Sequence, residues 1–262
     1  MKKYVFLFIS TFILTGSLYA QFVDNISNDV INGPVKKTTT IIRQNSDPSD
    51  VEKTIIWYDS IGRIVKTEEY GEEGPGMSYV YQYTDSNICW RFTYERKRLV
   101  KGAYCKIYLN SSGQKIASHE FYNNHLTRVD SIAYDAQGRV VETYASEYRE
   151  REPSLTSLYT YDSTGRLTEE RNIKTGKRYT ITYLPNGDYT KQFFDKNGKT
   201  YSQTCIVDKK GQLNRIESDE EKVKYSRYDR FGNWLKREAS VNTHSFIGWI
   251  GSTTERTIEY YK

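Results

Sequence analysis

One four-residue turn recurs along the chain and constrains its fold more than any other feature. It starts with Asp or Asn and ends with Gly, at Asp59–Gly62, Asn110–Gly113, Asp135–Gly138, Asp162–Gly165, Asp195–Gly198, Asp208–Gly211 and Asp229–Gly232. The first side chain can accept a hydrogen bond from the backbone two residues later, and Gly adopts a left-handed conformation without steric cost. A type I turn followed by such a Gly closes a β-hairpin, so the repeat predicts tandem hairpins.

The segments between these turns are typical of strands. Residues 54–58 and 158–161 are short runs of β-branched and aromatic residues, and the whole chain holds 24 Tyr. Between Gly165 and Gly211 a Gly recurs every 11 to 13 residues, and this spacing predicts a meander of short strands. Because open twisted sheets rarely exceed about ten strands, we expect an all-β fold in which the long antiparallel meander forms a curled or rolled sheet.

The N-terminus has the pattern of a secretory signal peptide. Lys2 and Lys3 precede an apolar run over residues 4–14, and Ala20 stands before Gln21. We therefore assign residues 1–20 to the signal peptide and residues 21–50 to an irregular lead-in. Residues 51–262 form the repeat domain, whose last segment, 242–262, is predicted to be a terminal cap strand. The mature protein is expected in the periplasm, at the cell surface or outside the cell, with no membrane span.

The net charge limits the possible partners. The net charge of +5 falls by two to +3 without Lys2 and Lys3, which gives no basis for a nucleic-acid partner.

The three cysteines are Cys89, Cys105 and Cys205. A Cys89–Cys105 disulfide with Cys205 free, or three separately packed thiols, are both compatible with this count.

No residue pattern indicates catalysis, a metal or a cofactor. His119 and His125 are spaced more widely than the His-Glu-x-x-His zinc motif and fall in strand-and-turn sequence. Adjacent carboxylates such as Glu169 and Glu170 point to opposite faces of a strand, so they are not a ready acid–base pair. One Asp per turn also supplies too few oxygen ligands for calcium. The four Trp and many Tyr could pack the sheet or form a sugar-stacking face.

The repeat itself resembles a known family. Tyr-Asp-x-x-Gly-Arg and a branched residue stand at positions 58–64, 134–140 and 161–167, and a Gly-Asn version stands at 228–234. This pattern is similar to the YD repeat, also called the RHS repeat, over most of residues 51–240. The resemblance implies an extended sheet of hairpins, which in large members winds into a shell around a toxin. This chain resembles the small stand-alone secreted bacterial members, for which surface or carbohydrate interaction and no catalytic residues are implied.

One repeated cation could contact a ligand. Arg63, Arg139 and Arg166 each follow a turn Gly, and alternating turns place them along one edge of the sheet. The row is either a solvated edge that discourages aggregation or a contact line for an acidic glycan.

We therefore expect an exported, non-catalytic structural or interaction protein. A carbohydrate-binding surface protein is the alternative, and a polysaccharide-acting enzyme ranks third. The expected partner is a cell-surface glycan or another envelope protein.

Overall fold

The computed structural model describes residues 31–47, 49–85, 87–146, 150, 152–208, 213–218, 221–242 and 249–262. The predicted signal peptide lies outside these residues. The strands are β1 Val35–Gln44, β2 Val51–Tyr58, β3 Ile64–Gly71, β4 Gly74–Asp85, β5 Ile88–Glu95, β6 Arg98–Leu109, β7 Lys115–Tyr122, β8 His125–Tyr134, β9 Val140–Ala145, β10 Ser154–Tyr161, β11 Leu167–Asn172, β12 Arg178–Tyr183, β13 Tyr189–Asp195, β14 Gly198–Val207, β15 Leu213–Glu217, β16 Glu221–Tyr228, β17 Trp234–Asn242 and β18 Trp249–Tyr260.

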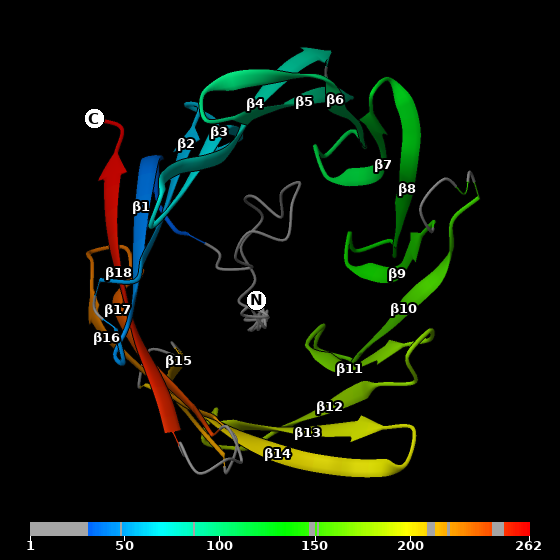
Figure 1. The fold of residues 1–262 in the computed structure, drawn as a ribbon. Helices are drawn as coiled ribbons and strands as arrows, with labels where there is room; N and C mark the ends of the chain where they lie inside the picture. Colours follow the sequence, from blue (N-terminus) through cyan, green and yellow to red (C-terminus); the bar gives the residue numbers. More distant parts are fainter. Residues whose placement is uncertain are drawn as a thin grey trace.

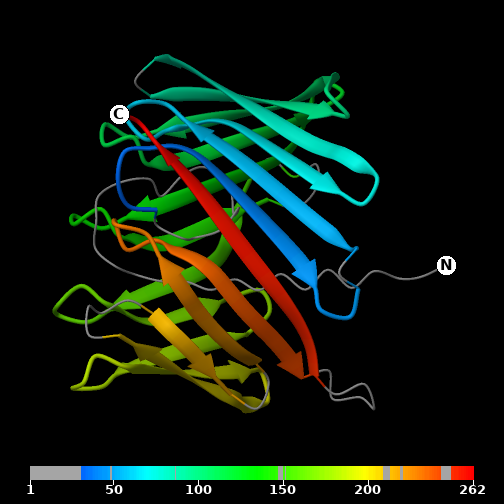
Figure 2. The same cartoon turned by 90° about the vertical axis from the view of Figure 1, so that its left-hand side faces the viewer.

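These strands form one closed antiparallel barrel (Figures 1 and 2). Each strand pairs with its neighbours in the chain, and β1 also pairs with β18 over nine residue pairs from Val35↔Tyr260 to Gln44↔Ser252. The all-β meander is therefore confirmed, but the curled or rolled open sheet is wrong because the sheet closes on itself. Closure pairs the backbone groups that two free edges would leave unsatisfied.

The strand that closes the barrel comes from the predicted lead-in. Residues 35–44 read Val-Lys-Lys-Thr-Thr-Thr-Ile-Ile-Arg-Gln and form β1 between β2 and β18, so the irregular assignment of residues 21–50 is wrong for this part. β-branched residues favour a strand there although no Asp-x-x-Gly turn precedes it. The predicted C-terminal cap strand is likewise a member of the ring, because β18 has a partner on both sides.

Side chains alternate between the two walls of the barrel. In β6, Ala103, Cys105, Ile107 and Leu109 are buried, and the residues between them are partly exposed. Interior and exterior residues alternate along every strand of a barrel, so the buried set defines the inner wall and the intervening set the outer wall. Two apolar clusters lie on the inner wall, one around Ile107 and one around Ile216.

The Asp-x-x-Gly turns share one geometry. In the first, Asp59 Oδ1 accepts hydrogen bonds from the backbone N–H of Ile61 (3.1 Å) and Arg63 (2.9 Å), and Gly62 has φ +85°. Equivalent bonds and positive φ values occur at the turns beginning with Asp135, Asp162 and Asp229. Because each of these turns joins an even-numbered strand to the next odd-numbered one, they lie on one rim of the barrel, here called the repeat rim.

We predict that Gly138→Val and Gly165→Val each lower the free energy of unfolding by about 1 kcal/mol or more. A β-branched residue disfavours the φ of +76° and +86° found at these positions. Gly165→Val should have the larger effect, because an added Cβ would stand 3.3 Å from the Arg139 guanidinium. Urea unfolding measures both changes, and midpoints equal to the parent would contradict the turn geometry.

Candidate functional site

The predicted row of Arg on the repeat rim is engaged within the fold. The Nε atoms of Arg63, Arg139 and Arg166 donate to the carboxylate of the Asp that opens the same turn, at 2.8, 2.6 and 2.8 Å. Each guanidinium also lies over a Tyr ring two strands further along the ring, with centroid distances of 4.1, 4.5 and 4.1 Å to Tyr83, Tyr161 and Tyr183. Of the three, only Arg139 and Arg166 follow consecutive repeat-rim turns, those between β8 and β9 and between β10 and β11. This arrangement links one hairpin to the next.

Sequence reasoning missed the Tyr partners of this row. The hydroxyl groups of Tyr83, Tyr161 and Tyr183 donate to the backbone carbonyls of Ile64, Val140 and Leu167, at the start of the preceding hairpin's second strand. Tyr161 and Tyr183 each stand directly before a repeat-rim turn, and this position could have identified them as partners of the Arg row.

Hydrogen bonds keep the turn carboxylates ionised by lowering their pKa. Donation from the Thr164 hydroxyl and from Arg166 holds the pKa of Asp162 well below its usual range. At Asp135 burial opposes ionisation, but hydrogen bonds from the backbone and side chain of Arg139 still lower the pKa. These Asp residues are therefore ionised structural acceptors at neutral pH.

The other predicted candidates are dispersed. Across the β7–β8 pair, His119 opposes Val129 and His125 opposes Tyr122, so the two His residues are not directly opposite each other. Among the described residues, no group of three or more His, Cys, Asp or Glu side chains could hold a metal ion. The three cysteines are buried and form no disulfide, and Cys89 lies opposite Ile107 rather than Cys105 in the β5–β6 pair.

The inner wall carries charged side chains as well as apolar ones. On β16, Glu221 accepts a hydrogen bond from the Gln203 amide (2.8 Å) and lies 3.6 Å from Arg237. Lys191 is only 5% exposed, and burial lowers its pKa, whereas burial raises the pKa of Glu170 nearby. Buried charges need fixed partners, so this part of the wall is a pre-organised polar lining.

A recess opens where the inner wall meets the rim opposite the repeat rim. It has a volume of about 600 Å³, within the usual range for ligand sites, and is lined by Glu120, Tyr122, Thr127, Arg128, Ala145, Ser146, Ser154, Thr156 and Lys174. These residues come from β7 to β10 and from the β11–β12 turn. Sequence reasoning found none of them, because three separate hairpins contribute and no motif joins them.

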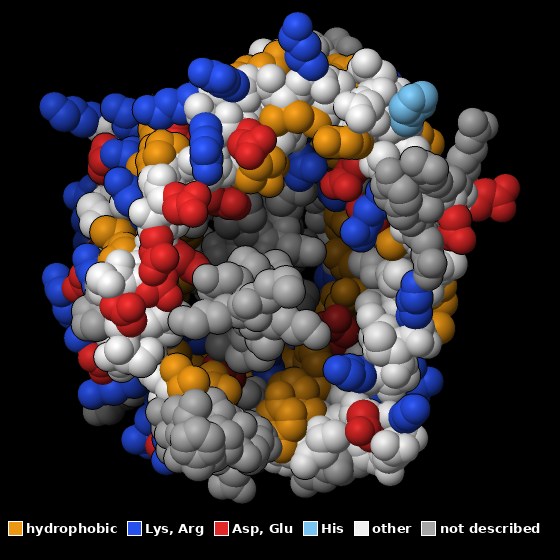
Figure 3. Space-filling view, viewed as in Figure 1, with side chains coloured by type: hydrophobic (Ala, Val, Ile, Leu, Met, Phe, Trp, Pro, Cys, Tyr) orange, Lys and Arg blue, Asp and Glu red, His pale blue; other side chains and the backbone are white. Residues whose placement is uncertain are grey.

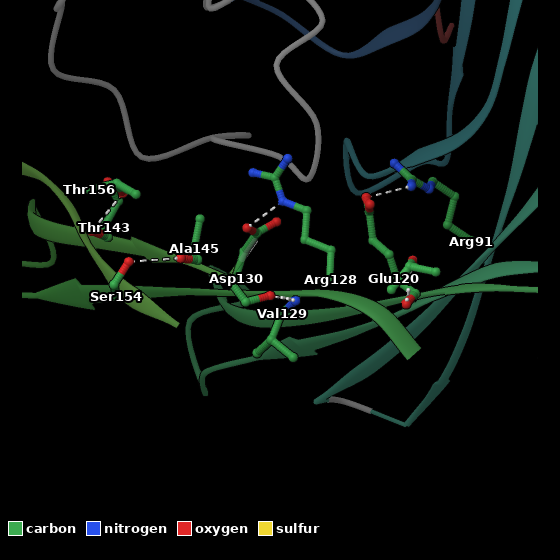
Figure 4. A network of polar contacts seen from close by, with 11 residues as sticks. Arg91, Glu120, Arg128, Val129, Asp130, Thr143, Ala145, Ser154 and Thr156 are labelled. Atoms are coloured by element: carbon green, nitrogen blue, oxygen red, sulfur yellow. Dashed lines mark hydrogen bonds and ion pairs between the residues drawn. The ribbon is translucent and has the colours of Figure 1, made fainter. Parts of the chain in front are cut away.

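Two ion pairs fix the floor of this recess. Arg91 lies 3.1 Å from Glu120, and the Nε of Arg128 donates to Asp130 at 2.8 Å. Figure 4 shows these four side chains on the same side of the sheet and Val129 pointing to the other side. The hydrogen bond and charge of Asp130 raise the pKa of Arg128, although burial opposes them. Arg128 nevertheless keeps 53% of its side chain exposed to the recess.

The strands around the recess are irregular. The β7–β8 register shifts between Glu120 and Phe121, and the β9–β10 register shifts between Leu155 and Ser157. Thr156 turns its hydroxyl to Thr143, at 2.8 Å from the carbonyl oxygen. Such bulges bend a strand and re-aim its side chains, and they are common beside functional sites.

The outer wall combines ion pairs with a row of aromatic side chains formed by Trp90, Tyr104 and Phe121. Cross-strand ion pairs join Lys37 to Glu259 (2.7 Å) and Arg43 to Glu255 (3.0 Å) at the closing seam. Further along the ring, Arg215 pairs with Glu217. Figure 3 shows Lys and Arg side chains projecting from the outside of the ring.

No described residue belongs to a helix that is long and apolar enough to cross a membrane.

Comparisons with known proteins support the barrel architecture. No protein-family model and no curated protein matches the sequence. The crystal structure of a porin-like protein from Bacteroides uniformis matches with a TM-score of 0.50 and 12% identity, over 86% of this chain and 98% of that chain. The Tc holotoxin pore of Photorhabdus luminescens matches with a TM-score of 0.36 and 11% identity, over 74% of this chain and 12% of that chain. The likeness to the porin-like protein is one of fold alone.

Proposed function

We propose that this chain is an exported, non-catalytic β-barrel that binds a polar ligand in the inner-wall recess. The observation that carries the proposal is the recess itself, a space of about 600 Å³ lined by charged and hydroxyl side chains, of which Glu120 and Arg128 are held in ion pairs. Ligand sites are usually pre-formed concave spaces with a few fixed polar groups.

Export follows from the signal-peptide pattern of residues 1–20. The exposed ion pairs at the β1–β18 seam suit contact with water, which favours the periplasm, the cell surface or the medium. The partner that we propose is an envelope component, either a glycan or a protein. The support for a non-catalytic role is that the three thiols are buried and that the turn carboxylates are engaged as structural acceptors.

We also propose that the chain is a relative of the YD-repeat proteins. The support is the coincidence of each Tyr-Asp-x-x-Gly-Arg motif with one structural unit. In that unit the Asp caps its turn and the Arg packs on the Tyr of a neighbouring hairpin.

We predict that Ala145→Trp abolishes ligand binding without unfolding the barrel, because the indole would fill the recess that Ala145 lines. The measurement is binding of the purified chain to a glycan array and to isolated cell-envelope fractions. Thr160→Trp is the matched control, since Thr160 is exposed on the outer wall. Equal binding by Ala145→Trp and the parent, or no binding to any envelope component by the parent, would contradict the proposed function.

A further inference from the structure

We infer that the ligand of the recess is a neutral carbohydrate, with one sugar ring packed on Tyr122 and its hydroxyl groups bound by Arg128 and Glu120. This assignment rests on the proposed function and names the ligand class for the same site. It replaces the acidic-glycan contact predicted for Arg63, Arg139 and Arg166, whose guanidinium groups already pair with Asp and stack on Tyr.

Tyr122 is placed to receive a ring. It is 55% exposed and is the one aromatic residue among the large, exposed apolar side chains of the described residues. It lines the recess at the end of β7, where the following Asn123 and Asn124 have φ of +49° and +62° and reverse the chain. An aromatic face with a polar tip suits a partner that presents C–H groups and hydroxyl groups together, as a pyranose does.

Paired charges explain why a neutral ligand fits best. Arg128 is held by Asp130, and Glu120 is held by Arg91, so these four charges are already paired within the fold. A charged ligand would have to compete with these intramolecular partners for Arg128 or Glu120. Hydroxyl groups both donate and accept, and they therefore match adjacent guanidinium and carboxylate groups.

The remaining lining residues agree with this ligand class. The Ser154 and Thr156 hydroxyl groups donate to the carbonyls of Ala145 and Thr143, so their oxygens stay available as acceptors, and Lys174 adds a cationic side chain to the lining. The recess is also open along one side of the rim, since its residues come from the β7–β8 and β11–β12 ends of the strands. We therefore expect a chain of sugars rather than a free monosaccharide to bind.

The test is isothermal titration of the purified full barrel with neutral hexasaccharides of glucose, mannose and xylose, and with hexagalacturonate. We expect at least one neutral oligosaccharide to bind, with less than about a twofold change in affinity between about 50 and about 500 mM NaCl. Tyr122→Ala and Arg128→Gln should each weaken this binding roughly tenfold or more. Tyr122→Phe should bind like the parent, because it keeps the ring face.

Matched controls on the outer wall are Tyr144→Ala and Arg171→Gln, which should leave binding unchanged. Preferential, salt-sensitive binding of hexagalacturonate would overturn the neutral assignment. So would neutral binding that Tyr122→Ala does not weaken. If no sugar binds but Ala145→Trp abolishes binding to an envelope protein, the sugar assignment fails and the proposed function stands.

Discussion

Asn233→Ala should lower the free energy of unfolding by about 3 kcal/mol, because Asn233 joins three parts of the barrel at its seam. Its side chain is 4% exposed and exchanges two hydrogen bonds with the backbone of Asn32, at 2.7 and 2.9 Å. Its amide also donates to the Asp229 carboxylate and to the Tyr260 hydroxyl. Truncation would leave the Asn32 backbone groups and the Asp229 carboxylate with fewer partners, and urea unfolding would measure the loss.

Arg166→Ala is the matched control for this substitution. Arg166 occupies the same position after its turn Gly, and its backbone N–H makes the same bond to the turn Asp. Its side chain is 51% exposed, so losing one ion pair and one ring contact should cost about 1 kcal/mol or less. Equal effects of the two substitutions would show that Asn233 has no special part in closing the barrel.

Gly102→Ala should destabilise the barrel by about 3 kcal/mol or more, because one methyl group would strike backbone atoms. An added Cβ would stand 2.9 Å from both the Cα of Asn123 and the N of Asn124, and Gly102 has φ +75°. The Gly102 carbonyl also accepts a hydrogen bond from Asn124 N–H at 3.1 Å, so the two segments cannot separate without losing it. Thermal and urea unfolding measure the effect.

Gly113→Ala separates the cost of the positive φ from the cost of the steric contact. Gly113 has nearly the same φ, +77°, but an added Cβ there meets nothing within 4 Å. Gly113→Ala should therefore lower the free energy of unfolding by about 1 kcal/mol, which is the cost of the backbone strain alone. If Gly102→Ala is no worse than Gly113→Ala, the close approach of the β7–β8 turn to β6 is not tight in solution.

The hairpins could be predicted from sequence because their causes are local. Asp59 and Gly62 lie within one turn, and the bond that Asp59 accepts depends only on its nearest neighbours. The alternation of turns between two rims then follows from a meander. The Asn at position 233, where other repeats carry Arg, was visible in the sequence, but its partner Asn32 is 201 residues away.

Closure and the recess depend on contacts that no local pattern records. β1 lacks the turn that marks the other hairpins, and its place beside β18 is set by the circumference of the ring. The recess needs Tyr122 and Arg128 from one hairpin and Ser154 from the next. Its shape comes from register shifts of one residue, which alternating apolar and polar residues do not predict.

The single seam between β1 and β18 has a consequence for how the chain folds. Every other strand pair joins segments that follow each other directly, whereas the seam joins Thr38 to Ile258. Contacts that are close in sequence form quickly, and long loops close slowly for entropic reasons. The hairpins can therefore assemble one after another, from any starting point, into an incomplete ring. The final joining of the two ends would be the slow, cooperative event, and until it occurs two unprotected strand edges would be available to pair with other molecules.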